Sequence, residues 1–315
     1  MDELEFDTPV FKQLAHNDTS AAAGHQGGIL IPKELDPYFP QLSGKTSATN
    51  PTIDENIQAI LVVGGKEVAT VDTRYQYQTW GGERPPERRI TSNLGPLRDQ
   101  AVVDDIVLIE RNLADRSLYR MTLLKKGSER HKAVLRNSSG KRWGVADPLQ
   151  APVSEPELEE AEKEQEDHEQ KPLKLMDNEA ALVETRSKRV ARGTAFQKLT
   201  SKYYENKCAV CGQGFVNAKG LAEVEAAHIV PRSKKGADDA RNGIALCRSH
   251  HWALDKGLWG VGADGNIVVA ASGGGKGSND LLKALAGKKP SPPNKATVTP
   301  AAEAWAWHIA NMFDR

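Results

Sequence analysis

Four residues with soft metal-binding side chains fall in two short clusters. Cys208 and Cys211 are separated by two residues, and Cys247 and His250 repeat that spacing further along the chain. Two such clusters can hold one ion in the tetrahedral arrangement of three cysteines and one histidine that is typical of structural zinc. The clusters use all three cysteines, which disfavours the alternative of buried free thiols acting as small apolar residues. The spacing therefore predicts a zinc centre, with His250 rather than its neighbour as the nitrogen ligand.

A histidine, an asparagine and a second histidine follow one another between and beside these ligands. His228 stands in Glu-Ala-Ala-His-Ile-Val-Pro, Asn242 precedes a glycine, and His251 directly follows the last zinc ligand. This order resembles the HNH endonuclease superfamily, most closely its McrA-like members. The resemblance covers about residues 180 to 262, and its motifs match the segments Ala227–Pro231, Asn242–Cys247 and His250–Gly257.

The resemblance implies a role for each residue of the motif. His228 would be the general base, Asn242 would fix the loop or orient that histidine, and His251 would bind a catalytic Mg²⁺ or Mn²⁺. These roles fit the chemistry, because attack of water on a phosphodiester needs a base and a cation that neutralises the developing charge. A metal-bound histidine must be neutral whereas the base accepts a proton, so we expect the two histidines in different environments.

The catalytic metal needs further ligands. Asp255 lies four residues after His251, hence on the same helical face, and is the second ligand that we predict. Many HNH proteins carry an acidic residue or a histidine directly before the base, but this chain has Ala227 there. Glu225 is expected to point away from His228 along a strand, so it is not included in the site.

Two helices are expected around these motifs. Residues 178–204 have apolar residues spaced three to four apart and lead directly into the first cysteines. Residues 301–315 form a second amphipathic pattern at the other end of the domain. Its side chains expected to pack inward are Trp305, Trp307, Ile309 and Met312.

The composition is that of a globular protein. Apolar residues make up 39 % and charged residues 27 % of the 315 residues, and no run approaches the ~20 apolar residues that span a bilayer. The acidic N-terminus lacks the pattern of a signal peptide, so we expect a cytoplasmic protein without a membrane partner.

An acidic segment divides the chain. Glu155 to Glu169 contains nine acidic residues and one lysine. Residues 151–175 are therefore predicted to be an interdomain linker that its like charges keep extended, with a solvated helix as the alternative. The predicted domains are residues 1–150 and 176–315, and both are mildly basic, as a DNA-binding protein requires.

The N-terminal domain shows recurrent short β-type runs. They are separated by Gly, Pro, Asn and Asp, which favours a β-barrel or sandwich and makes the whole chain an α+β protein. The one helical candidate is Lys33–Phe39, opened by Pro32. The runs are GGILIP, IQAILVV, VATVDTRYQYQTW, DDIVLIERN and LYRMTLLKK.

One polar segment in this domain, residues 81–91, is either a solvated charged loop or a reader of base edges and phosphates. Residues 14–95 resemble the N-terminal effector domain of the EcoRII restriction endonuclease, a B3-like β-barrel that recognises DNA. The matching elements are NDT, GHQ, IP, FP, NP and RIT. The resemblance implies that an N-terminal arm and a loop grip DNA, with Pro85 and Pro86 replacing two polar residues of the family. The residues it assigns to DNA are Asn17, Asp18, His25 and Gln26 in the arm and Arg84, Glu87, Arg88 and Arg89 in the loop.

Together these patterns predict a restriction endonuclease that acts on double-stranded DNA. The B3-like domain would select a sequence, either unmodified or modified, and the HNH domain would cut it, with a homodimer expected for cutting both strands. The alternative is a zinc-stabilised DNA-binding regulator that has lost catalysis, which the missing ligand at Ala227 would favour. A mobile-element or homing nuclease fits the effector-like domain less well.

Overall fold

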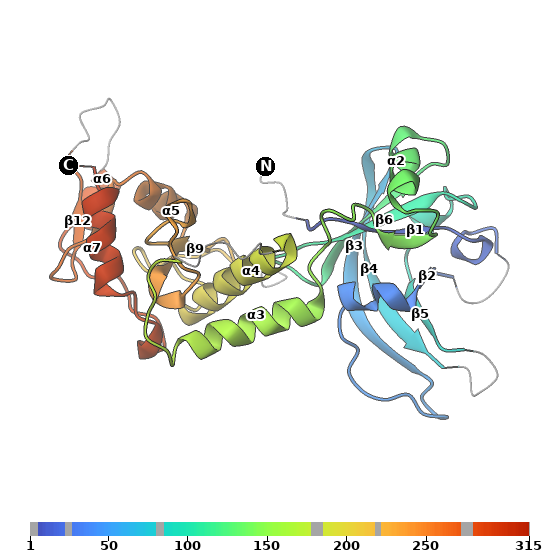
Figure 1. Ribbon diagram of the computed structural model, residues 1–315, viewed down its shortest axis with the longest axis horizontal. Coiled ribbons are helices and arrows are strands. Elements are labelled where there is room, and N and C mark those ends of the chain that lie inside the picture. The colour runs from blue at the N-terminus through green and yellow to red at the C-terminus, as the bar shows by residue number, and fades with distance from the viewer. Residues whose placement is uncertain are drawn as a thin grey trace. The chain divides into compact units, whose positions relative to one another are not determined.

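The computed structural model describes residues 6–22, 27–79, 85–177, 185–217, 222–271 and 280–314. The chain divides into two compact units, Met1–Glu157 and Leu158–Arg315, each with its own buried core (Figure 1). In the described part of the chain, no helix has the length and apolar character needed to cross a membrane.

One curled sheet of eight strands forms the first unit (Figure 1). The strand order is β2-β5-β4-β3-β7-β6-β1-β8, and all neighbours are antiparallel except β3 and β7. The strands are β1 Val10–Gln13, β2 Ile29–Ile31, β3 Thr52–Val63, β4 Lys66–Gln78, β5 Glu87–Thr91, β6 Ile106–Arg111, β7 Leu118–Leu124 and β8 Trp143–Val145.

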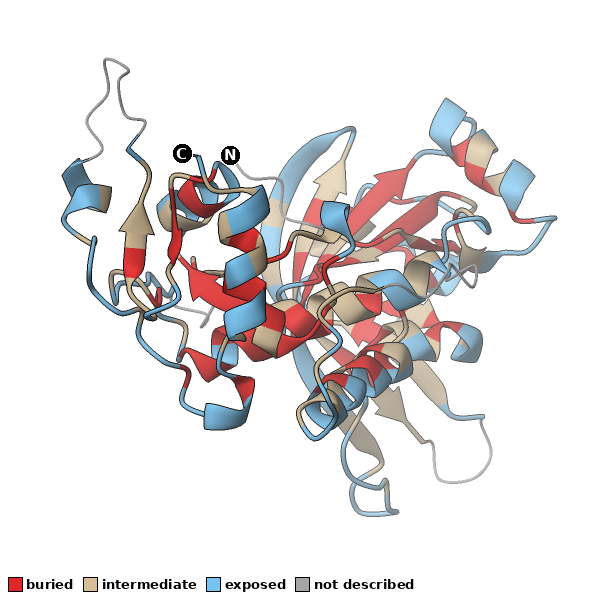
Figure 2. Cartoon of the chain, turned by 60° about the vertical axis from the view of Figure 1, so that its left-hand side comes forward, coloured by how far each residue is buried: buried red, intermediate tan, exposed pale blue. Residues whose placement is uncertain are grey.

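Both faces of this sheet are covered, as the alternation along β6 shows. Ile106 and Leu108 belong to one buried cluster, and Val107 and Ile109 belong to another. Successive side chains of a strand point to opposite faces, so a run of apolar residues serves two cores at once. The first cluster also contains Val134 of α2 (Glu129–Asn137), and Figure 2 shows the buried stretches concentrated on the strands.

The β-rich character expected of the N-terminal unit is confirmed. All five predicted runs contain strands, and the helical candidate is the 3-10 helix η2, Lys33–Tyr38. The sheet is open, because β2 and β8 are its two edges in the described chain, and the B3-like assignment stays a prediction. The elements of this unit that were not predicted are the strands β1, β5 and β8 and the helix α2, together with the 3-10 helix η1 (His16–Asp18) and α1 (Gly95–Arg98).

A two-stranded hairpin followed by a helix is the centre of the second unit. Strand β9 (Glu225–His228) pairs antiparallel with β10 (Gly243–Leu246), and α5 (Arg248–Asp255) begins directly after β10. The connection between the two strands contains the 3-10 helices η3 (Arg232–Lys234) and η4 (Ala240–Asn242). Motif residues far apart in sequence are therefore placed on one ββα unit.

Further elements pack around this hairpin and share its buried cluster. The predicted helix 178–204 is observed as α4, Arg186–Tyr203, and residues 178–184 lie outside the described chain. The predicted C-terminal helix is observed as α7, Ala302–Asn311, where Trp305 is buried and the other three predicted side chains are half-buried. The remaining elements are β11 (Trp259–Val261), β12 (Ile267–Val269), α6 (Asp280–Lys283) and η5 (Ala296–Val298).

A close approach at Gly257 ties the end of α5 to the end of α7. Gly257 has φ +68°, and a Cβ there would lie 1.9 Å from the carbonyl oxygen of Met312. The amide of Asp314 donates to the carbonyl of Gly257 at 2.9 Å. Only glycine satisfies both the positive φ and the contact, which explains why the motif requires it.

The acidic segment is helical, which is the alternative that the sequence left open, and it is not the extended linker that we expected. Residues Glu155–His168 form helix α3, which runs across the boundary between the two units. In the first unit, Glu155 is buried and pairs with Arg111 and Arg116. In the second unit, Lys198 pairs with Glu162 at 2.8 Å. Helix formation and these cations offset the repulsion between like charges that the composition alone suggested.

Candidate active site and metal centre

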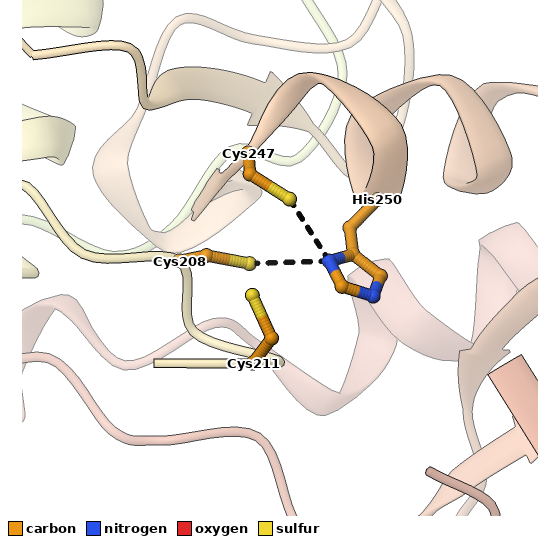
Figure 3. A group of neighbouring side chains, drawn as sticks. All are labelled: Cys208, Cys211, Cys247 and His250. Carbon is orange, nitrogen blue, oxygen red and sulfur yellow. Dashed lines mark hydrogen bonds between the residues drawn. The ribbon is translucent and has the colours of Figure 1, made fainter. Parts of the chain in front are cut away.

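The four soft ligands converge on one point, as Figure 3 shows. Their ligand atoms all lie within 4.8 Å of one another. His250 Nδ1 lies 3.0 Å from the sulfur of Cys247 and 3.5 Å from that of Cys208. Tetrahedral zinc with bonds of ~2.3 Å keeps its ligands roughly 3.8 Å apart, so the donor set and its spacing fit a zinc ion.

Local structure explains this convergence. Cys208 and Cys211 lie on one turn after α4, where the amide of Gly212 donates to the carbonyl of Cys208. Cys247 is the residue that precedes the first turn of α5, so His250 follows it on the same turn. The indole of Trp259 donates to the carbonyl of His250 at 2.9 Å and holds that turn in place.

The environment favours a thiolate at one cysteine. Burial opposes ionisation of Cys208, but hydrogen bonds from His250 and from backbone amides outweigh it and lower the pKa of its thiol to about 6. Burial raises the pKa of Cys247 to about 12, and nearby Cys208 adds to this effect. A dication bound by these sulfurs would favour the thiolate form of all three.

His228 lies at the end of β9 between an aromatic ring and a carboxylate. Its ring stacks on Phe196 of α4 with centroids 3.9 Å apart, and its Nε2 lies 2.9 Å from Asp238 Oδ1. The side chain of His228 is 19 % exposed, whereas that of Asp238 is 3 % exposed. The imidazole is therefore held by buried groups on two sides and still reaches solvent.

Asp238 stays ionised in this environment. Burial works to raise the pKa of Asp238, but the hydrogen bond with His228 and the charges of Arg232 and Arg192 hold it below its ordinary value. Arg232 pairs directly with the second carboxylate oxygen, and Arg192 Nε lies 4.0 Å from it. A carboxylate fixed by two cations can accept a hydrogen bond from His228 without taking its proton.

Asn242 fixes the loop that joins the two strands. Its side chain is 0 % exposed. It donates to the carbonyls of Val230 and Ala237 at 3.1 and 3.0 Å and accepts from the amide of Val230 at 2.9 Å. These bonds close the loop just before Asp238, and no described hydrogen bond joins the side chain of Asn242 to that of His228.

His251 and Asp255 lie on one face of α5, as their spacing predicted, with His251 Nε2 3.7 Å from Asp255 Oδ2. The other ring nitrogen, Nδ1, lies 2.8 Å from Glu225 Oε2. The hydrogen bond with Glu225 raises the pKa of His251 above its ordinary value, aided by Asp255 and opposed by burial. His251 thus has two carboxylate partners, where the sequence indicated one.

Small residues make room at the hairpin. A Cβ on Gly243 would lie 2.8 Å from two ring carbons of Phe196, and a Cβ on Gly236 would lie 1.8 Å from the carbonyl oxygen of Val230. Gly243 pairs with His228 across the two strands, so its missing side chain admits the ring that stacks on His228. The glycine of the HNH motif is thereby explained by packing.

Three residues of this site were missed from the sequence. Asp238 and Phe196 contact His228, and Glu225 contacts His251. Asp238 and Asp239 form an acidic pair between His228 and Asn242, which is the one signal that could have pointed to a carboxylate partner. Glu225 was predicted to point away from His228, and nothing in the sequence indicated its contact with His251.

The residues of the first unit that were predicted to contact DNA differ in their exposure to solvent. Asn17 is exposed, whereas Asp18 is buried, lies 2.8 Å from Lys12 Nζ and accepts from the amides of Ala15 and Leu30. The oxygens of Asp18 thus hold the arm together in this structure, and its contact with DNA stays a prediction. Three of the predicted residues lie outside the described chain: His25, Gln26 and Arg84.

The other three predicted contacts are strand residues rather than loop residues, which corrects the expectation. Glu87, Arg88 and Arg89 open β5, paired with β2 and β4. Arg89 donates to Glu87 at 2.8 Å on one face of the sheet. On the other face, Arg88 donates to Asp36 at 2.6 Å. Alternation along the strand therefore separates Arg88 from the other two side chains.

Comparisons with known proteins match this geometry at the second unit. A family model described as HNH endonuclease matches residues 208–262, which contain the candidate site residues discussed above except Phe196 and Arg192. Among solved structures, the chain is similar to one titled "Modification dependent TagI restriction endonuclease". That match has 14 % identity and a TM-score of 0.32, and it covers 88 % of this chain and 79 % of the other. No curated protein sequence matches the chain.

Proposed function

We propose that this chain, a deoxyribonuclease with an HNH endonuclease domain at residues 208–262, is a restriction endonuclease that selects its DNA site through the N-terminal unit. The observation that carries the proposal is the pairing of His228 with the buried carboxylate of Asp238. His251 and Asp255 lie together on one face of α5 in the same ββα unit. Substrate would be double-stranded DNA, and the target would be a defined sequence whose base modification either permits or blocks cutting.

In this mechanism His228 is the general base. When its Nε2–H donates to Asp238, the lone pair is on Nδ1, which can take a proton from the attacking water. Phe196 limits rotation of the ring, and Arg232 keeps Asp238 in its accepting form. Asp238 is thus a positioning residue, equivalent in function to the carboxylate that orients histidine in other hydrolases.

His251 and Asp255 would hold a divalent cation, Mg²⁺ or Mn²⁺, which when bound would neutralise charge at the phosphate and at the leaving oxygen. The side chains of these residues are 24 % and 51 % exposed, so a hydrated ion can reach them. One imidazole nitrogen and a carboxylate oxygen are suitable donors for such an ion.

Zinc in the Cys3His centre would have a structural role. Its four protein ligands, Cys208, Cys211, Cys247 and His250, leave no open position for a substrate. The ion would instead join the turn after α4 to the start of α5, and so set the distance between the hairpin and the helix that carries His251.

DNA selection is proposed for the polar side chains of the first unit. Arg89 and Glu87 lie on one face of β5. Their register partners on the neighbouring strand β4 are Gln76 and Gln78. Arginine and glutamine are side chains that read guanine and adenine edges. The exposed Asn17 of the arm would add a further contact.

Cleavage of plasmid DNA tests the proposal. Zinc-loaded protein is incubated with methylated and unmethylated plasmid, with Mg²⁺, with Mn²⁺ or with neither, beside a His228→Ala control. We expect metal-dependent cuts at recurrent sites by the unaltered protein and none by His228→Ala, which should still shift DNA on a gel. Metal-dependent cutting without a preferred site would overturn the restriction function alone. Absence of all cutting would favour the regulator, the alternative supported by Ala227.

A further inference from the structure

Glu225 and Ala227 share one face of strand β9. Side chains two residues apart point the same way, whereas His228 points to the opposite face. Phe196 of α4 stacks on His228 on one side, and His251 of α5 contacts Glu225 on the other. This face of β9 is turned to α5. Ala227 offers no metal ligand there, and Glu225 is the carboxylate on the same face.

The carboxylate of Glu225 is held at both oxygens. Oε2 lies 2.8 Å from His251 Nδ1, and Oε1 lies 3.3 Å from Arg248 Nε. Because Nδ1 is occupied by this contact, the second ring nitrogen of His251 is the one that turns to Asp255, 3.7 Å away. A cation bound by both at ~2.1 Å would set its two donors about 3.0 to 3.7 Å apart, so the gap fits an ion.

We propose that Glu225 is a positioning residue of the catalytic metal site, which fixes the tautomer and orientation of His251 so that Nε2 binds the ion together with Asp255. The proposal rests on the function proposed above. Metal-binding histidines commonly donate their second N–H to a carboxylate, and this partner raises the basicity of the ligand nitrogen. The arrangement strengthens the imidazole ligand in a site that lacks a metal-binding side chain at Ala227.

A double-mutant cycle on Mn²⁺ affinity tests the inference without DNA. Electron paramagnetic resonance of the full-length, zinc-loaded protein measures Mn²⁺ binding to the unaltered chain, Glu225→Ala, His251→Ala and the double variant. Loss of an orienting partner typically weakens metal binding about 10- to 100-fold. We expect that loss for Glu225→Ala in the unaltered background and none in the His251→Ala background, because Glu225 acts through His251.

Matched variants separate positioning from general effects. Glu225→Gln keeps an oxygen acceptor for Nδ1–H and should retain more affinity than Glu225→Ala. Glu205→Ala removes an exposed carboxylate of the same unit and should leave affinity unchanged. Zinc content and the unfolding midpoint are measured for each variant, and Glu225→Asp replaces Glu225→Ala if the latter does not fold.

The outcomes are distinct. Unchanged Mn²⁺ affinity in the Glu225 variants overturns the inference, and an equal loss in the His251→Ala background overturns it too by making Glu225 an independent ligand. Both results leave the proposed function standing if the unaltered protein cuts DNA. Conversely, the cycle can succeed in a protein that cuts no plasmid, which would reject the function alone.

Discussion

Asp238 determines which nitrogen of His228 is available to water. The contact at Nε2 leaves Nδ1 for the proposed role of base, and two arginines hold the carboxylate in its accepting form. An amide in its place could present an N–H to the ring and favour the wrong tautomer. The chemistry of the base therefore depends on a residue outside the His-Asn-His pattern.

Asp238→Asn should lower kcat for DNA cleavage on the order of 10²- to 10⁴-fold, as expected when a histidine base loses its orienting carboxylate. DNA affinity should stay within about twofold. The measurement is single-turnover cleavage with saturating protein, beside the exposed Asp264→Asn as a matched control. A cleavage rate equal to that of the unaltered protein would remove Asp238 from the mechanism.

Local spacing determined which site residues could be predicted. Cys208 and Cys211, or His251 and Asp255, are neighbours on a single turn, so their proximity follows from residue spacing. The partners Asp238 and Glu225 reach their histidines only after the hairpin closes and α5 packs on it. Such contacts depend on tertiary structure, which a spacing pattern does not contain.

At the level of elements, α4 packs closely against the hairpin because Gly243 has no side chain. Phe196 occupies the space that a Cβ would need. The same geometry places the aromatic ring against His228, so one contact serves both the packing and the proposed base.

Gly243→Ala should therefore lower stability by about 1 to 3 kcal/mol, the usual cost of overpacking a core. The matched control is Gly193→Ala in α4, where a Cβ would meet nothing within 4 Å. That change should raise stability by about 0.5 to 1 kcal/mol, since alanine is the better helix former. Chemical denaturation measures the free energy of unfolding of both variants. Changes of the same sign in the two variants would contradict the packing explanation.

Sequence patterns also explain which elements were found. The long strands β3 and β4 were evident, whereas β1 and β8 have four and three residues and carry little periodicity. Helix α3 was expected to be extended because charge was considered without its partners Arg111, Arg116 and Lys198. These cations come from distant parts of the chain.

For the whole molecule, the two separate cores imply that folding of the two units depends on zinc to different extents. All four soft ligands belong to the second unit, and the first contains no cysteine. Structural zinc sites contribute binding energy directly to folding, so its loss should affect one unit far more than the other.

Cys211→Ser should unfold the second unit and leave the sheet of the first. Circular dichroism is expected to lose helical signal while the β contribution persists, and the full chain should lose cleavage at every metal concentration. Asp255→Asn provides the contrast, because it should lose activity with the unfolding transition intact. Loss of both units in Cys211→Ser would show that their folding is coupled.

The contact between Gly257 and the end of α7 determines which residues are needed to fuse this nuclease domain to another protein. The stretch that matches the HNH family stops at residue 262, but the carbonyl of Met312 and the amide of Asp314 close over the catalytic helix. A module cut at the family boundary would expose the end of α5 and the apolar face that Trp305 covers. A functional graft onto another recognition domain therefore has to carry the chain through Asp314.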